Sequence, residues 1–214
     1  MKVAVVDYEV GNLYSVQRAL EVCGATDITV SSDPATILAA DRVVLPGVGA
    51  FADGIRALRE RGLDVALKAF ASSGRPLLGI CLGMQLFATA SEEFGEHAGL
   101  DIIPGRVRAL PRTGKHGSTL KVPYVGWSPL IPQGGVNWEG GILCDLRQDE
   151  AVYLVHSFHF VPSDPADKLA TYLYGENEIT AAVGRNNVVG VQFHPEKSGK
   201  FGLAIVSRFL RTGP

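Results

Sequence analysis

The 214-residue sequence predicts an α/β fold with an open, mostly parallel, doubly wound sheet and antiparallel additions in its second half. In the first part of the chain, short apolar runs rich in β-branched residues alternate with segments of helical periodicity. After residue 91, glycine, proline and short alternating segments take over, which favours antiparallel strands with long connections. We expect residues 1–214 to form a single domain.

The individual elements follow from local patterns. Residues 3–6 are a valine-rich run typical of a buried parallel strand. Asn12 is suited to cap the helix that follows, and Gly24 to end it. The next expected elements are a strand at 27–30, a turn at 32–34, a strand at 42–45, and helical residues 52–73 with a break near Gly62.

The second half of the chain is expected to be richer in strands. The apolar run after Pro76 predicts a buried strand, and short strands are expected between residues 99 and 141. The remaining expected elements are strands at 152–160, 170–174, 180–183 and 187–193, and a final amphipathic helix at 199–211.

Charge and hydropathy exclude several classes of protein. Twenty basic and 22 acidic residues give a formal charge of −2, without the basic excess usual in nucleic-acid binders. The first apolar run is too short for a signal peptide, and no run approaches the length that spans a membrane. We therefore expect a cytoplasmic protein without nucleic-acid or membrane partners.

Cysteines and histidines do not suggest a metal centre or a disulfide framework. The three cysteines, Cys23, Cys81 and Cys144, are widely spaced and form no Cys-x-x-Cys pair. His156 and His159 lie close together, but no nearby carboxylate or cysteine completes a ligand set. We expect no metal and no cofactor.

One cysteine has the setting of a nucleophile. Cys81 lies between Gly79 and Gly83, after the apolar run 76–78 and before the helical residues 82–88, which is the form of a nucleophile elbow. Such a turn is sharp, so residues without Cβ suit the flanking positions. The start of a helix favours the thiolate, which is the attacking species. A buried structural cysteine is the alternative, and this short motif alone does not decide.

A glycine-containing strand end could lie beside this cysteine. The strand at 42–45 runs into residues 46–51, where Gly47 and Gly49 would let the backbone approach a ligand with N–H groups free to donate. The alternatives are a plain turn or a weak phosphate loop, but the segment lacks the lysine of a P-loop. Carboxyl ends of neighbouring parallel strands share one crevice, so Cys81 is expected nearby.

A base for the thiol is expected near the end of the chain. His194 and Glu196 are two residues apart at a strand end, where period two would put them on one side, and Pro195 would stiffen the pair. Glu196 could orient one ring nitrogen of His194 while the other faces Cys81, the logic of a catalytic triad. The alternative is a surface His–Glu pair, which is common at strand ends.

Taken together, these motifs resemble the class I glutamine amidotransferases, and within them the glutaminase subunits of imidazole glycerol phosphate synthase. The resemblance covers essentially the whole chain. It is carried by Pro46-Gly47-Val48-Gly49, Gly79-Ile80-Cys81-Leu82-Gly83-Met84-Gln85 and Gln192-Phe193-His194-Pro195-Glu196, with support from residues 11–13, 155–157 and 194–199.

The resemblance implies a reaction and roles for matching positions. Cys81 would attack the side-chain amide of glutamine, His194 would protonate the ammonia and then activate water, and Glu196 would orient His194. The further implied roles are oxyanion-binding N–H groups at Val48 and Leu82, glutamine-binding positions at Gly47, Gly49, Gln85 and Ser157, and a partner-facing surface at Asn12 and Lys197. A helix cap and a solvated lysine are the alternatives for the last two.

The resemblance also implies a partner. Ammonia would pass to a (β/α)₈-barrel cyclase subunit in a heterodimer that makes imidazole glycerol phosphate and aminoimidazole carboxamide ribotide in histidine biosynthesis. One segment departs from the usual Pro-His-x-Gly-Trp-Asn motif, because Tyr124 and Ser128 stand at its second and last positions. A subunit feeding a surface-sugar amidotransferase is therefore an alternative within the family. Two alternatives from other classes are a free-standing cysteine hydrolase and a non-catalytic module, and the intact Cys81, His194 and Glu196 argue against the module.

Overall fold

The computed structural model describes residues 1–133, 138, 141–144 and 150–211. Its main sheet has eight strands in the order β2-β1-β3-β4-β14-β13-β12-β9. The first five strands in that order run parallel, and β13, β12 and β9 are antiparallel additions. The predicted mostly parallel α/β sheet with antiparallel strands in the second half is confirmed.

The strands of this sheet are β1 (Lys2–Val6), β2 (Asp27–Ser31), β3 (Arg42–Gly47), β4 (Leu77–Cys81), β9 (Ile131–Pro132), β12 (Lys168–Tyr174), β13 (Asn177–Arg185) and β14 (Val188–Val191). Two smaller sheets contain β5 (Ala90–Ser91), β6 (His97–Ala98), β7 (Gly105–Ala109) and β11 (Phe158–Pro162), and the ribbon β8 (Tyr124–Pro129) with β10 (Ala151–His156). The helices are α1 (Leu13–Val22), α2 (Pro34–Ala39), α3 (Phe51–Glu60), α4 (Leu63–Ser72), α5 (Leu82–Leu86) and α6 (Gly199–Arg211), with 3₁₀ turns η1 (Pro165–Asp167) and η2 (Pro195–Lys197).

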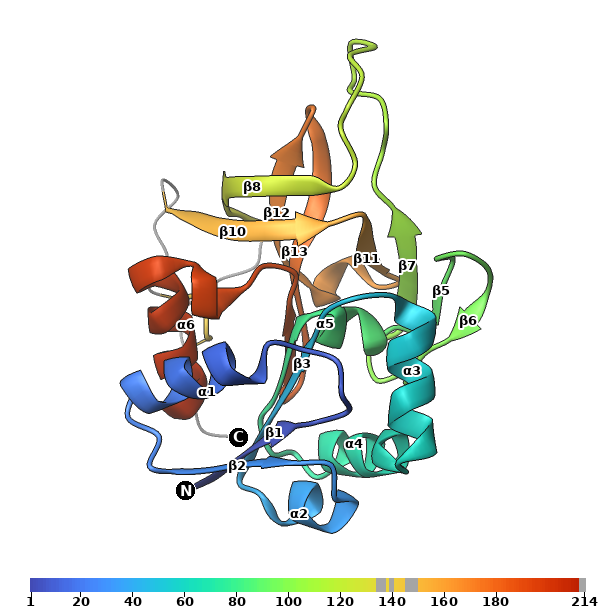
Figure 1. The fold of residues 1–214 in the computed structure, drawn as a ribbon. Helices are drawn as coiled ribbons and strands as arrows, with labels where there is room; N and C mark the ends of the chain where they lie inside the picture. The colour runs from blue at the N-terminus through green and yellow to red at the C-terminus, as the bar shows by residue number, and fades with distance from the viewer. Residues whose placement is uncertain (134–137, 139–140, 145–149, 212–214) are drawn as a thin grey trace.

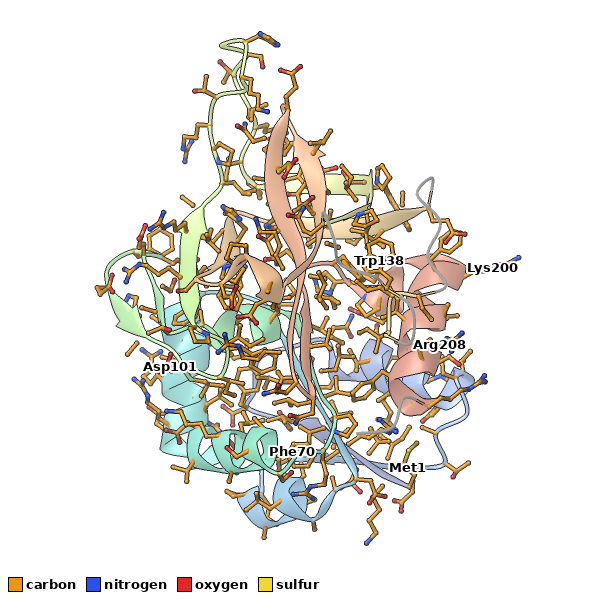
Figure 2. All side chains as sticks on the ribbon, turned by 180° about the vertical axis from the view of Figure 1, so that it is seen from behind. Met1, Phe70, Asp101, Trp138, Lys200 and Arg208 are labelled. Carbon is orange, nitrogen blue, oxygen red and sulfur yellow. The ribbon has the colours of Figure 1, made fainter. Side chains whose placement is uncertain are left out.

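Helices cover the sheet on both faces. α1 packs against α6 on one face, while α3 and α4 lie on the other (Figure 1). Each face has its own buried apolar cluster, one including Leu20 and Phe209, the other Phe51 and Phe70. Phe70 lies between α4 and the sheet, whereas Lys200 points outward from α6 (Figure 2). None of the described helices is long and apolar enough to cross a membrane.

Most expected elements are present, with two differences. Residues 32–34 lead into a helix, α2, because the Asp33 carboxylate caps the N–H groups of Ala35 and Thr36 and Pro34 occupies the first turn. The single strand expected at 152–160 is two strands, since Ser157 separates β10 from β11 and the two pair with different neighbours. The expected break near Gly62 is confirmed.

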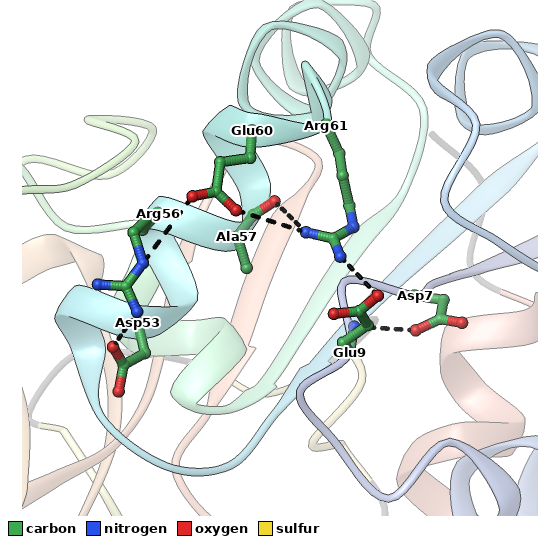
Figure 3. Close-up of polar contacts among 7 residues, drawn as sticks. All are labelled: Asp7, Glu9, Asp53, Arg56, Ala57, Glu60 and Arg61. Atoms are coloured by element: carbon green, nitrogen blue, oxygen red, sulfur yellow. Dashed lines mark hydrogen bonds and ion pairs between the residues drawn. The ribbon is translucent and has the colours of Figure 1, made fainter.

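The loop after β1 is held in place by α3. Arg61, which follows α3, places its guanidinium 2.7 Å from a Glu9 carboxylate oxygen, and it also donates to the Ala57 carbonyl (Figure 3). The Glu9 N–H donates to Asp7 Oδ1 at 3.0 Å. These contacts fix the segment between β1 and α1, which carries Tyr8 to the edge of the sheet where β3 ends.

Candidate active site

Three parallel strands end side by side at one edge of the main sheet. Gly47 at the end of β3 is in register with Cys81 at the end of β4, and β14 lies on the other side of β4 with Val191 opposite Ile80. A cavity of about 260 Å³ opens there. It is lined by Val48, Gly49, Cys81, Leu82, Gln85, Glu93, Pro123, Val155, His156, Ser157, Phe158 and His194. The cysteine and histidine singled out in the sequence therefore share one cavity.

Cys81 has the backbone of a strained elbow. Its φ of 55° and ψ of −110° lie outside the regions that residues with a Cβ usually occupy. Close packing beneath the turn needs a glycine, because a Cβ on Gly83 would lie 1.8 Å from the Leu45 carbonyl oxygen. The helix α5 that follows has only five residues. It can therefore stabilise a negative charge on the sulfur through the unpaired N–H groups of its first turn, but not through the dipole of a long helix.

His194 is held by backbone contacts on both sides. Its N–H donates to the Tyr153 carbonyl at 3.0 Å, and its carbonyl accepts from the Ser198 hydroxyl at 2.7 Å. Its Nδ1 is 2.8 Å from Glu196 Oε1, and both side chains are almost fully buried. The strand period is not what pairs them: β14 ends at Val191, and the pair lies on η2, where the chain folds back in a 3₁₀ turn.

The electrostatics of His194 favour its charged form. Burial lowers the pKa of the imidazole, but hydrogen bonding and charge from Cys81 and Glu196 outweigh burial and raise it to about 9. Because Nδ1 is held by Glu196, Nε2 is the ring nitrogen left for Cys81 and for other groups in the cavity. A cysteine thiolate beside an imidazolium, oriented by a carboxylate, is a nucleophile paired with a general acid.

The strand end at residues 46–49 contributes backbone to the cavity. Val48 and Gly49 line it, and Val48 is 42% exposed. Gly47 is buried below and does not line the cavity: a Cβ there would lie 2.2 Å from the Tyr8 hydroxyl. That hydroxyl donates to the Pro46 carbonyl at 2.7 Å. Tyr8 is thus a support for this segment that the sequence analysis missed.

Gln85 and Ser157 both line the cavity, but Gln85 is committed to the protein through its nitrogen. Its Nε2 donates to the Phe158 carbonyl and to Gln192 Oε1, each at 2.9 Å. No described residue donates to its Oε1. A ligand in the cavity would therefore meet Gln85 as a hydrogen-bond acceptor.

Glu93 is a cavity residue that sequence reasoning missed. It is 9% exposed, and its Oε2 accepts from the Phe51 N–H at 2.6 Å at the start of α3. A carboxylate here would match a cationic group on a ligand. Nothing in the local sequence separates Glu93 from an ordinary surface acid, because the contact that fixes it joins residues 42 positions apart.

His156 is also in the cavity wall, and it is neutral. Burial lowers its pKa to about 4. Since the Phe158 carbonyl only accepts, Nδ1 donates to it at 2.8 Å and Nε2 accepts from the Tyr172 hydroxyl at 2.8 Å. Among the described residues, no group of three or more histidine, cysteine or acidic side chains is arranged to hold a metal.

The two departures from the expected motif contact each other. The hydroxyls of Tyr124 and Ser128 are 2.7 Å apart, and the Tyr124 ring stacks on Tyr172, with the centroids 5.3 Å apart. The altered residues are thus linked to His156 through Tyr172.

Asn12 and Lys197 lie on neighbouring elements and are both exposed. Asn12 Oδ1 accepts from the Ser15 N–H at 3.3 Å, so Asn12 does cap α1. Lys197 ends η2, one residue after Glu196. Nearby on β8, Val125 and Trp127 are more than half exposed.

Comparisons with known proteins show which proteins this chain is similar to. Residues 4–212 match the family model for glutamine amidotransferase class-I. The chain is 46% identical over 210 residues to imidazole glycerol phosphate synthase subunit HisH 1 of Legionella pneumophila (strain Paris), covering 98% of each. It is 44% identical over 223 residues to subunit HisH of Rhodospirillum rubrum, covering 100% of each. A solved structure of PurLQS from Thermotoga maritima has a similar fold, with a TM-score of 0.70 at 19% identity, over 98% of this chain and 97% of that one.

Proposed function

The chain belongs to the class I glutamine amidotransferases and, within them, to the HisH glutaminase subunits of imidazole glycerol phosphate synthase in histidine biosynthesis, and from this premise we propose how its residues act. Cys81 is the nucleophile, His194 the acid and base, and Glu196 the group that orients His194. The observation that carries this assignment is the shared cavity of Cys81 and His194, with Glu196 2.8 Å from the far ring nitrogen. Residues 1–214 act as one amidotransferase domain.

The first half of the reaction releases ammonia. The Cys81 thiolate attacks the carbon of the glutamine carboxamide, and the carbonyl electrons move onto oxygen. When the carbonyl re-forms, the C–N bond breaks, the nitrogen takes the proton from His194 Nε2, and ammonia leaves. The product is a thioester between Cys81 and the glutamyl group. A raised pKa at His194 supports its role as the acid.

The second half restores the enzyme. Neutral His194 takes a proton from water, and the oxygen of that water attacks the thioester carbon. The C–S bond breaks, giving the Cys81 thiolate beside a protonated His194 and a new carboxyl group, which releases its proton to solvent as glutamate leaves. In both halves the negative oxygen would be met by the N–H groups of Val48 and Leu82, which belong to the segments that flank the sulfur.

Glutamine recognition is proposed for Gly49, Gln85 and Ser157, together with Glu93. Glu93 and the Gln85 carbonyl oxygen accept hydrogen bonds and suit the substrate ammonium. Gly47 does not line the cavity, and its lack of a side chain lets Tyr8 pack against the end of β3. The cavity of about 260 Å³ is of the size that suits an amino acid and not a polymer.

Changing Glu93 to glutamine is expected to raise KM for glutamine about 10-fold or more with a small effect on kcat, since a charged hydrogen bond contributes about 1.5–3 kcal/mol. Steady-state kinetics of the complex measure both constants. Glu92→Gln is the control, because Glu92 pairs with Arg106 and Arg108 outside the cavity. A kcat loss as large as the rise in KM would contradict a binding role for Glu93.

The partner is proposed to be a (β/α)₈-barrel cyclase subunit that receives the ammonia in a heterodimer. The exposed Asn12, Lys197, Val125 and Trp127 lie around the elements that carry His194, which supports docking at the mouth of the cavity. The HisH relatives favour the cyclase over a sugar amidotransferase as recipient. The free thiols of Cys23 and Cys81 suit a reducing compartment, and we propose the cytoplasm.

Reconstitution tests this function. The purified chain and a cyclase subunit of imidazole glycerol phosphate synthase should together convert glutamine and the cyclase substrate into imidazole glycerol phosphate. The cyclase alone should need added ammonium salt. If the pair forms product only with ammonium salt and never with glutamine, the proposed glutaminase function is wrong.

The pH dependence of glutamine hydrolysis should show an alkaline limb near pH 9. Because the pKa of His194 is raised to about 9, the imidazole keeps its proton at neutral pH and loses it only as pH rises through that value. The acid that protonates the leaving nitrogen is then gone, so kcat/KM of the complex falls.

Glu196→Gln should move that limb to lower pH and lower kcat/KM at neutral pH about 10-fold or more, because one of the two partners that raise the pKa loses its charge. His116→Ala is the control, since His116 is an exposed histidine paired with Glu176 away from the cavity. A limb that stays near pH 9 in the Glu196 variant would argue against Glu196 as the orienting group.

A further inference from the structure

Gln192 touches the nucleophile, and the triad does not use it. It follows β14 directly and is fully buried. Its Nε2 lies 3.6 Å from Cys81 Sγ, within hydrogen-bonding range for sulfur. Its backbone N–H donates to the Ala181 carbonyl at 2.8 Å, which anchors the residue to β13.

The orientation of the Gln192 amide follows from its neighbours. The Phe158 carbonyl can only accept, so the Gln85 side chain must turn its nitrogen toward it. The same nitrogen donates its second hydrogen to the Gln192 side chain, which must therefore present Oε1 to Gln85. The Gln192 nitrogen is then left to face the sulfur.

The direction of this chain of hydrogen bonds suits a thiolate. An N–H group aimed at a buried anion stabilises it more than the neutral form, and in a water-poor site such a bond is stronger. The donor follows β14, the neighbour of the strand β4 that ends at Cys81, so it holds the sulfur from the segment that leads to His194. A substrate group donating to Gln85 Oε1 would polarise the same chain.

We propose that Gln192 is a further catalytic residue: its amide N–H holds and stabilises the Cys81 thiolate, and Gln85 links that contact to the glutamine-binding cavity. The inference rests on the proposed glutaminase function for the link to substrate. The contact with the sulfur itself depends only on the geometry of this site.

The test is the pH dependence of Cys81 alkylation by iodoacetamide in the full chain, with mass mapping to separate Cys81 from Cys23 and Cys144. Gln192→Met removes the donor without adding charge. We expect the midpoint of the rate profile to rise by about one pH unit, so that alkylation is about 10-fold slower at pH values below the midpoint. Gln133→Met is the matched control, because Gln133 donates to Thr171 on another strand. An unchanged midpoint in Gln192→Met would overturn the proposal.

Turnover gives a second readout. In the complex, Gln192→Met should lower kcat for glutamine about 10-fold or more.

If this variant does not fold, NMR of the unmodified chain decides. The side-chain amide resonance of Gln192 should shift as Cys81 ionises, and it should not shift with pH in Cys81→Ala. No shift overturns the proposal. If the unmodified complex does not hydrolyse glutamine but Gln192→Met still shifts the alkylation midpoint, the glutaminase function is wrong and the contact between Gln192 and Cys81 stands.

Discussion

Replacing Cys81 by alanine should abolish glutamine-dependent formation of imidazole glycerol phosphate while ammonia-dependent formation by the same complex survives. The variant lacks the only sulfur that lines the cavity among the described residues, and no thioester can form. Removing a nucleophile typically costs roughly 10³- to 10⁶-fold in turnover. Product formation measured with glutamine and with ammonium salt, under the same conditions, gives both rates.

Cys23→Ala is the matched control for this experiment. Cys23 lies where α1 meets α6, and its Sγ donates to the Leu203 carbonyl at 3.2 Å, away from the cavity. Its loss should leave both rates unchanged. Equal loss of the glutamine and ammonia reactions in Cys81→Ala would show that Cys81 supports the complex as a whole and is not the nucleophile.

The meeting of Cys81 and His194 could be predicted because it follows from topology. In a parallel sheet the carboxyl ends of neighbouring strands share an edge, and apolar runs in the sequence locate those ends. Local glycines identified the elbow in the same way, since the sharp turn needs them at fixed offsets. The sequence predicts the His194–Glu196 contact, but the reason is not the strand period: Pro195 begins a 3₁₀ turn, and that turn brings the two side chains together.

The supports of the site could not be predicted. Tyr8 reaches Pro46, Glu93 reaches Phe51 and Gln192 reaches Cys81 only through tertiary contacts between distant parts of the chain. No periodicity or local motif specifies such contacts.

The missed helix α2 has a local cause. It is six residues long and contains Thr36 and Ile37, which are weak helix formers. Its Asp33 cap and Pro34 also favour a turn, because the same residue types start turns and helices. In contrast, α3 and α4 were predicted with their break at Gly62, because their apolar spacing extends over several turns.

Gly83→Ala should destabilise the chain by about 3 kcal/mol or more and lower glutaminase activity sharply. A Cβ at this position would lie 1.8 Å from the Leu45 carbonyl oxygen, and backbone cannot rotate away as a side chain does. α5 and β3 would have to separate, which shifts Cys81 relative to Val48 at the ends of neighbouring strands. For a chain of this size the melting temperature should fall by about 6–12 °C.

Gly54→Ala separates this backbone clash from a general effect of added volume. Gly54 lies in α3 on the same face of the sheet, and the atoms nearest to a Cβ there would be the ends of the Leu82 and Leu86 side chains, at 3.2–3.4 Å. Those ends can move, and alanine favours a helix by about 1 kcal/mol over glycine, so stability should change little or rise. Equal melting temperatures for the two variants would mean that α5 can move away from β3 at little cost. The close approach of Gly83 to Leu45 would then not be what fixes the turn at Cys81.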